Sequence, residues 1–289
     1  MVVSQASRGG VSDEPTKSKT ITTMPPLNVV NRPPPSPESI SSKGSMSNRP
    51  RTDSFSTLES NLQKCKQKYG PRHAAVAASW NRIGAYHFEH GHEESARQAF
   101  QKAIECDPSE HLPVSYYNLG IVYGSLGIYA KAVFVLEQAL EAYQLVPTEP
   151  LQLAKIHHQL GLTYTLAENY VKAHSSFQMA KQLRHGNAPA TARTLDAIGK
   201  VYLLQGDREA AYSCHEQAFQ VLPSTTSLVH KATIHWAQHE YAKVLEILHE
   251  AHRLQPSRGL LSQMAAAYDK LDMPEAANQC RQQIPMYAH

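Results

Sequence analysis

The feature that most constrains the fold of this chain is a pattern that recurs four times between residues 77 and 224. Each copy holds a glycine in an apolar stretch, then an alanine at a constant distance and a larger side chain one helical turn after that alanine. A repeat of this kind predicts a stack of similar supersecondary units, each burying its apolar face against the next. The four sets are Gly84, Ala96 and Phe100; Gly120, Ala132 and Leu136; Gly161, Ala173 and Phe177; and Gly199, Ala211 and His215.

The residues around each glycine resemble the tetratricopeptide repeat, whose pattern is Trp-x-x-Leu-Gly-x-x-Tyr, then Ala-x-x-x-Phe, then Pro. The second copy, Tyr116-x-x-Leu119-Gly120-x-x-Tyr123, shows the likeness well. The resemblance implies an all-α fold, a right-handed superhelical solenoid of helix-turn-helix repeats. The small glycine would let the two helices of a repeat approach closely. We expect repeats near 77–110, 113–147, 154–187 and 192–224, with degenerate copies at 225–257 and 258–285.

The N-terminal segment differs in composition from the rest of the chain. It is rich in serine and proline and contains the run from Pro33 to Pro37, in which only Ser36 is not proline. Apolar residues there are too few to offset the entropy of ordering the backbone, so we expect a disordered tail over 1–54. The solenoid is expected over 55–289, with a capping helix at 55–69. Ser56 and Glu59 have the spacing of a capping box at the start of that helix.

Two serines of the tail have neighbours that protein kinases prefer. Ser54 follows Arg49-x-Arg51, the spacing of basophilic kinase sites, and Ser36 precedes a proline. Both are therefore phosphorylation candidates. A phosphate on Ser54 would add roughly −1.5 to −2 charge beside a helix start, where the helix dipole favours it. One hypothesis is accordingly a phospho-regulated module that acts through its tail, and the alternative is an inert solvated leader.

The charge balance argues against a nucleic-acid binder. Lysine and arginine number 28 against 25 aspartates and glutamates, and the whole surplus of +3 lies in the N-terminal segment. No apolar stretch of about 18 residues predicts a membrane span. The start of the sequence lacks the apolar core of a signal peptide. The four cysteines have neither metal nor redox spacing, which favours reduced thiols in a cytoplasmic or nuclear protein. The sequence specifies no oligomeric state.

Motifs for catalysis and for phosphate binding are absent from the sequence, so we expect no enzyme activity and no cofactor. His87, His90 and His92 cluster beside Glu89 and Glu93, a set of groups that zinc could use. Because His90-Gly91-His92 falls at the expected turn of the first repeat, we interpret these residues as solvated turn residues and predict no metal site.

A stack of helical hairpins presents a long concave surface lined mainly by the first helix of each pair. By resemblance, the expected function is a non-enzymatic scaffold or adaptor that holds an extended peptide or a partner helix there. Chaperone-binding members of the family clamp a carboxylate with five groups, of which this chain matches only Asn118 and Lys155, so we do not expect that clamp. Amide, phenol and cationic groups suit a protein or peptide partner with acidic side chains, although the same residues could be ordinary solvated helix residues. The expected groove residues are Asn81, Tyr117, Asn118, Lys155, His158, Arg193 and Lys200.

A narrower resemblance concerns the approach to the first repeat. The stretch from Tyr69 to Gly84 is similar to the approach to a repeat in kinesin-light-chain-type proteins. The Leu-Asn-Asn-Leu-Ala core of that family is absent here. This resemblance implies a cargo adaptor as an alternative function.

Overall fold

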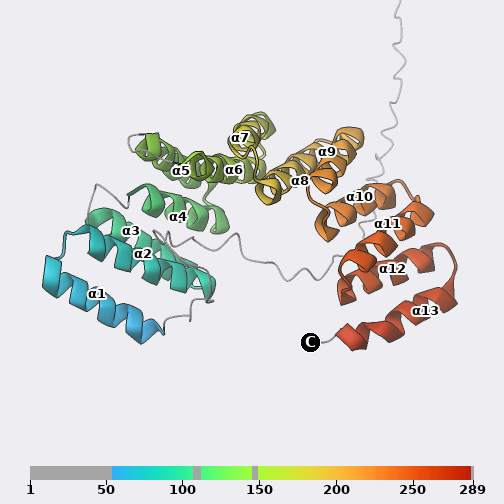
Figure 1. Ribbon diagram of the computed structural model, residues 1–289, viewed down its shortest axis with the longest axis horizontal. Helices are drawn as coiled ribbons and strands as arrows, with labels where there is room; N and C mark the ends of the chain where they lie inside the picture. The colour runs from blue at the N-terminus through green and yellow to red at the C-terminus, as the bar shows by residue number, and fades with distance from the viewer. Residues whose placement is uncertain (1–53, 107–111, 145–148, 288–289) are drawn as a thin grey trace, which may run out of the picture.

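The computed structural model describes residues 54–106, 112–144 and 149–287, and every regular element in these ranges is a helix. The helices follow one another along an arc (Figure 1). This confirms the predicted all-α, right-handed superhelical solenoid. The expected tail and Ser36 lie outside the described residues. The elements are α1 Phe55–Tyr69, α2 Ala74–Glu89, α3 Glu93–Cys106, α4 Leu112–Ser125, α5 Tyr129–Gln144, α6 Pro150–Leu166, α7 Tyr170–Leu183, α8 Ala188–Leu204, α9 Arg208–Val221, α10 Thr225–Ala237, α11 Tyr241–Leu254, α12 Arg258–Lys270, α13 Pro274–Gln283 and the short 3-10 helix Ile284–Tyr287.

After α1, consecutive helices pack as hairpins, from α2 with α3 to α12 with α13. Each expected repeat range overlaps most of one such hairpin. Some first helices begin about a turn earlier than the pattern suggested: α6 starts at Pro150 rather than near 154, and α8 at Ala188 rather than near 192. Proline in the first turn explains both starts, because its missing N–H would have no partner there. The Asn187 side chain also accepts a hydrogen bond from Ala190 N and caps α8.

A glycine in each of the first four hairpins sets how closely the two helices approach. A Cβ atom on Gly84 would lie 2.6 Å from the ring of Phe100, and one on Gly161 would lie 2.6 Å from the ring of Phe177. Both rings are fully buried and have no room to move aside. Gly120 meets Leu136 in the same way. The fixed spacing in the sequence therefore reflects a direct glycine-to-side-chain contact inside each hairpin.

In all six hairpins of the described ranges, the turn between the two helices contains one residue with a left-handed backbone conformation. Such a backbone conformation favours glycine, because a Cβ atom is strained there. Only half of the turns use glycine, so the sequence marks them unevenly. The residues and their φ angles are Gly91 (75°), Gly127 (73°) and Gly206 (84°), then Glu168 (57°), His239 (62°) and Asp272 (59°).

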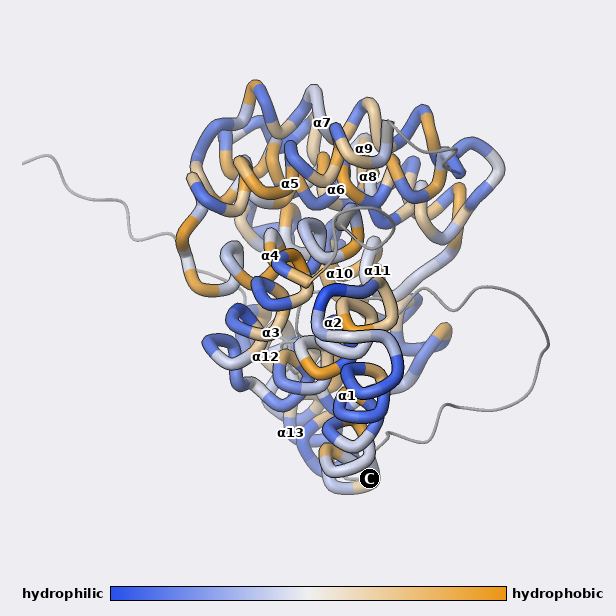
Figure 2. Tube along the Cα trace, turned by 90° about the vertical axis from the view of Figure 1, so that its left-hand side faces the viewer, coloured by the Kyte–Doolittle hydropathy of each residue, from blue (hydrophilic) through white to orange (hydrophobic). Residues whose placement is uncertain are grey.

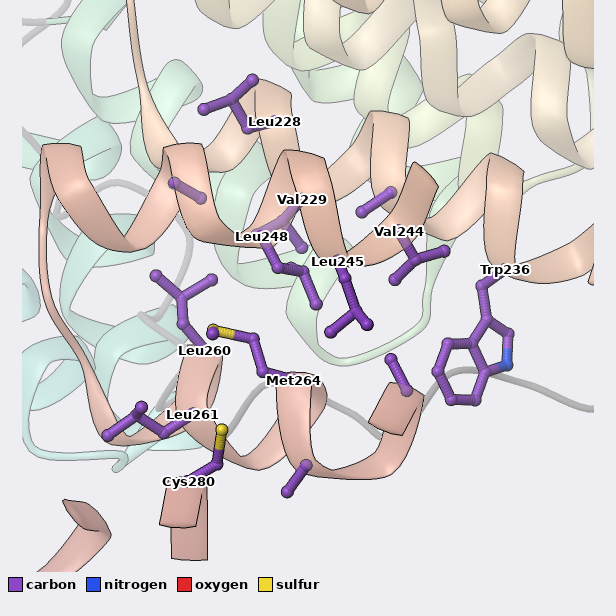
Figure 3. Packing of buried hydrophobic residues seen from close by; sticks show 14 of the residues in the cluster. Leu228, Val229, Trp236, Val244, Leu245, Leu248, Leu260, Leu261, Met264 and Cys280 are labelled. Atoms are coloured by element: carbon purple, nitrogen blue, oxygen red, sulfur yellow. The ribbon is translucent and has the colours of Figure 1, made fainter. Parts of the chain in front are cut away.

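The two degenerate repeats have a well-packed core of their own. Figure 3 shows Leu248 and Leu260 gathered with Met264 between the helices of this region. Where the four earlier repeats have Leu-Gly or Ile-Gly, the first degenerate repeat has Lys231 followed by a fully buried alanine. Lys231 is itself buried, and its Nζ pairs with the carboxylate of Glu216. The repeat geometry therefore continues here on different residues.

The start of α1 differs from the expected capping box. The helix begins at Phe55, so Ser56 lies inside it and the predicted capping box with Glu59 is wrong. Ser54 is the residue before the helix, and its Oγ lies 3.0 Å from Ser56 Oγ and 2.8 Å from Thr57 Oγ1. It caps no backbone N–H. Ser54 is exposed, and its phosphorylation remains a prediction.

Among the described residues, no helix is both long enough and apolar enough to cross a membrane. Figure 2 shows why: hydrophilic and hydrophobic residues alternate around the helices instead of forming one continuous apolar segment. The alternation is what a stack of amphipathic hairpins requires.

Candidate peptide-binding groove

The first helices of consecutive hairpins form the inner layer of the arc. Helix α4 contacts both α2 and α6, and α6 contacts α8. In Figure 1, α4, α6 and α8 lie on the inner side, and α5, α7 and α9 lie on the outer side. The inner layer is therefore the surface on which a groove would be built, and the expected groove residues all belong to it.

A ladder of polar contacts joins neighbouring inner helices. Each contact of this ladder, called a rung here, uses the same two repeat positions. The first residue stands three positions before the glycine of one repeat. The second stands five positions before the residue that aligns with that glycine in the next repeat. The shared register fixes how one hairpin is rotated against the next, because a buried polar group must keep its partner. The rungs are Asn81 Nδ2 to Ser115 Oγ (2.8 Å), His158 Nδ1 to Thr194 Oγ1 (3.4 Å) and Ser227 Oγ to Asp196 Oδ2 (3.0 Å).

Two of the expected groove residues lie beneath the surface. Asn81 is 9% exposed, and its amide nitrogen donates to Ser115. Asn118 is 2% exposed. Asn81 therefore takes part in the packing between hairpins. The place of both amides in the groove stays a prediction. Alignment on the glycines placed them on the correct helices but gave no information on their depth.

The other expected groove residues separate into two groups. Tyr117, His158 and Arg193 lie around a residue that the sequence reasoning missed, Arg184, which follows the end of α7. Arg184 is 5% exposed and donates from Nη1 to the carbonyl oxygen of Ala190, at 2.9 Å, and to the Thr194 hydroxyl. The inner layer between α4, α6 and α8 therefore carries a basic cluster, defined here as Tyr117, His158, Arg184 and Arg193.

The second group lies further along the inner layer. Lys200 is exposed, and its charge acts on His230, in the next repeat. Lys155 is partly buried on α6. Lys155 on α6 and Lys200 on α8 add positive charge to the inner layer.

Burial and two neighbouring arginines keep His158 neutral at ordinary pH. Burial, followed by the charges of Arg184 and Arg193, lowers the pKa of His158 to about 3. In the unfolded chain the same imidazole takes up a proton near pH 6.5. The unfolded state therefore binds more protons below that pH, and stability falls as the pH drops from about 6.5 toward 3.

We expect this histidine to make the protein measurably acid-sensitive. Each pH unit below about 6.5 costs up to about 1.4 kcal/mol, so lowering the pH from 7 to 5 should remove up to about 2 kcal/mol of unfolding free energy through His158. Urea unfolding of the wild type and of His158→Gln at both pH values measures this share. An equal loss in the two proteins would show that other histidines cause the acid sensitivity.

A buried Asp–His–His group joins the fourth and fifth hairpins. Asp196 Oδ1 lies 2.8 Å from His215 Nδ1 and 3.6 Å from His230 Nδ1, and Asp196 Oδ2 accepts from Ser227. The rings of His215 and His230 are 4.6 Å apart. Burial alone would raise the pKa of Asp196, but the hydrogen bond from His215 and the nearby His230 imidazole hold it at about 2. The carboxylate is therefore ionised, and its link persists until strongly acidic pH.

The sequence reasoning missed this group because its members come from three helices, α8, α9 and α10. A signal was present: His215 stands where the other repeats have Phe100, Leu136 and Phe177, and its ring packs on Gly199. Within the described ranges, Asp196, His215 and His230 are also the three groups close enough to share a metal ion, with ligand atoms within 4.8 Å of one another. Both carboxylate oxygens already accept hydrogen bonds, so the group works as a polar link without one.

The histidines at the first turn are arranged differently. The ring of His90 stacks on Tyr86 at 4.0 Å, and its Nδ1 lies 2.7 Å from the Tyr86 carbonyl oxygen. The rings of His87 and His92 are 5.9 Å apart. His90 is therefore engaged with the end of α2, whereas His87 lies within that helix and is half-buried. The interpretation of the three histidines as solvated turn residues stays a prediction.

Family models and curated relatives match the chain. Models described as Tetratricopeptide repeat match residues 77–110, 99–134 and 152–224. Two curated proteins of Arabidopsis thaliana are similar: Kinesin light chain-related 3 is 20% identical over 230 residues, and Kinesin light chain-related 2 is 24% identical over 180 residues. These alignments cover 76% and 58% of this chain. The chain spans about a third of the first relative and about a quarter of the second, at 32% and 27%.

Solved structures show a similar fold. A tetratricopeptide repeat protein from Parabacteroides merdae superposes with a TM-score of 0.60 at 15% identity, covering 81% of this chain and 86% of that one. The anaphase-promoting complex assembly Cut9–Hcn1 gives 0.57 at 14% identity, over 81% of this chain and 43% of that one. PilF of Pseudomonas aeruginosa gives 0.56 at 17% identity, over 73% and 91%. At these identities the likeness shows the architecture alone.

Proposed function

This chain carries tetratricopeptide repeats over 77–134 and 152–224, and from that premise we propose that it is a non-enzymatic scaffold that binds an extended acidic peptide along the inner helices α4, α6 and α8. Tetratricopeptide repeats and their structural neighbours support a protein-interaction role in general. The observation that carries the finer proposal is the basic cluster on the inner layer, in a chain whose repeat region is formally neutral.

The arrangement of polar groups on the inner layer suits an extended peptide better than a small-molecule substrate. The inner layer offers cations, a phenol and imidazoles, but the polar groups between the helices are engaged in the ladder that joins neighbouring hairpins. An extended chain that lies across α4, α6 and α8 would meet positive charge at several successive points. Charge complementarity of this kind determines which partner binds and how fast it arrives more than it determines total affinity.

Charge reversal on the inner layer is expected to weaken binding without loss of the fold. A peptide selected on the full-length chain from a random library serves as the probe. Lys155→Glu combined with Lys200→Glu should weaken it by about 1–3 kcal/mol, measured by calorimetry. The matched control is Lys131→Glu with Lys172→Glu, which changes the net charge equally on exposed positions of the outer helices α5 and α7.

If the inner-face double variant binds the peptide as tightly as the wild type, the peptide does not bind in the groove. The hollow of about 650 Å³ lined by Lys181, His185 and Gln217 would then be the next candidate. A random library that yields no binder for the full chain would contradict peptide binding itself.

The similarity to two kinesin light chain-related proteins favours a cargo adaptor as the second candidate function. Co-purification of the full chain with a motor heavy chain would separate it from a general scaffold. Deletion of residues 1–53, the tail that carries Ser36, tests whether the tail contributes to regulation. Ser54, at the start of α1, stays in the shortened chain and would be tested by substitution to alanine.

A further inference from the structure

Arg184 is a buried cation without a counter-charge. Arg184 as a whole residue is 5% exposed, and no carboxylate of the described residues forms an ion pair with it. Both hydrogen bonds that the structure shows for this group start at Nη1, and its Nε–H is buried without an acceptor. Most buried guanidinium groups are paired with an acid, because removing such a charge from water is costly.

The groups around Arg184 add positive charge and do not offset its own. The charges that act on it come from Arg193, which is exposed on α8, and from the Tyr117 phenol on α4. Burial followed by the charge of Arg193 lowers the pKa of Arg184 to about 10, so it stays charged at neutral pH. His158, on α6, is held neutral beside it. The inner helices α4, α6 and α8 and the end of the outer helix α7 thus bring two cations, a phenol and an imidazole together.

The hydrogen bonds that Arg184 donates within the fold do not explain why its charge is buried. Its two acceptors are satisfied without it, because the Thr194 hydroxyl already donates to the Ala190 carbonyl oxygen at 3.0 Å. Removing the guanidinium would therefore leave neither of these groups without a partner. A charge that is costly to the fold and unnecessary for its hydrogen bonds indicates a role in binding.

We propose that Arg184 and Arg193 form a subsite for the carboxylate of an aspartate or glutamate side chain of the bound peptide, an inference that rests on the proposed function. The guanidinium is suited to a carboxylate because it presents parallel N–H donors to two oxygens. The Tyr117 phenol acts electrostatically on Arg184, and the Thr194 hydroxyl lies within hydrogen-bond distance of both the Arg184 guanidinium and the His158 imidazole. The subsite lies between α4, α6 and α8, in the middle of the inner layer.

The test compares stability and binding in one variant. Arg184→Met removes the charge and keeps an apolar stem, so its melting temperature should rise relative to wild type. Binding of a blocked peptide of alternating Asp and Glu, followed by NMR on the full-length chain, should become at least about tenfold weaker. The matched control is Arg253→Met, which removes the same formal charge from an exposed position on α11 and should leave binding unchanged.

Two further readouts locate the peptide carboxylate. The isosteric peptide of alternating Asn and Gln should bind at least about tenfold more weakly than the acidic one. The pKa of His158 should rise when the acidic peptide is bound, because a carboxylate offsets the two arginine charges. A purely structural Arg184 would behave differently, since its loss would lower the melting temperature and leave the preference for acidic peptide intact.

The proposal is overturned if the acidic peptide does not bind, if it binds Arg184→Met as tightly as wild type, or if the neutral peptide binds equally well. These results are distinct from failure of the proposed function. Neutral peptides selected from the random library that still depend on Lys155 and Lys200 would keep groove binding and remove only the carboxylate subsite.

Discussion

Gly161→Leu is expected to be among the most destabilising single changes in the repeats. Even the first added carbon would lie 2.6 Å from two ring atoms of Phe177, a fully buried residue. The remaining carbons have no space between α6 and α7, which pack directly against each other. Overpacking of this kind costs about 3 kcal/mol or more. For a folded region of this size, the melting temperature should fall by about 6–12 °C.

A smaller matched pair isolates the contact from helix propensity. Alanine favours a helix over glycine by about 1 kcal/mol, so Gly→Ala should stabilise a helix wherever the methyl group has room. Gly124 is such a place, since its added Cβ would meet only the Thr163 hydroxyl oxygen, at 4.0 Å. Gly124→Ala should therefore raise the melting temperature, whereas Gly161→Ala should lower it. A rise in both variants would show that the assigned repeat register is wrong.

The second large effect is expected at the Asp–His–His group. His215→Phe alone removes the closest partner of the buried Asp196 carboxylate, and breaking a buried pair in this way costs about 3–5 kcal/mol. The same loss is expected for Asp196→Ala. Urea unfolding at pH 7, where the carboxylate is ionised and His215 has its partner, gives both values.

The double variant Asp196→Asn with His215→Phe should recover most of that loss. It transfers to the fourth hairpin the pair found at the same positions of the first, Asn81 and Phe100. The new amide could donate to Ser227 as Asn81 donates to Ser115. We expect a coupling energy of about 2–3 kcal/mol in the cycle formed by Asp196→Asn, His215→Phe and the double variant. Losses that simply add would mean that the two side chains act independently.

The repeat pattern predicted the fold because it records packing within each hairpin. The constant interval from glycine to alanine places the large side chain of each repeat opposite its glycine, as Gly84 and Phe100 show. Three of the turns could not be recognised in the sequence, because residues such as Glu168 adopt the left-handed conformation without being glycine. A family pattern detects residue types, so it does not detect a conformation that an unusual residue adopts.

The candidate site was predicted only in outline. Aligning the repeats placed Tyr117, His158 and Arg193 on the inner helices, where the structure brings them together. Burial depends on neighbours that are distant in sequence, so the depth of Asn118 could not be anticipated. Arg184 was missed because it follows a second helix, outside the positions that the pattern compares.

The measurement that tests the central claim most directly is photo-crosslinking of the full-length chain with a selected peptide that carries a photoreactive group. Mass spectrometry then identifies the helix that each adduct modifies. Binding in the groove predicts adducts on the inner helices α4, α6 and α8, reduced by Lys155→Glu with Lys200→Glu. Adducts confined to the outer helices α5, α7 and α9, unchanged in that variant, would contradict the assignment of the inner layer as the binding surface.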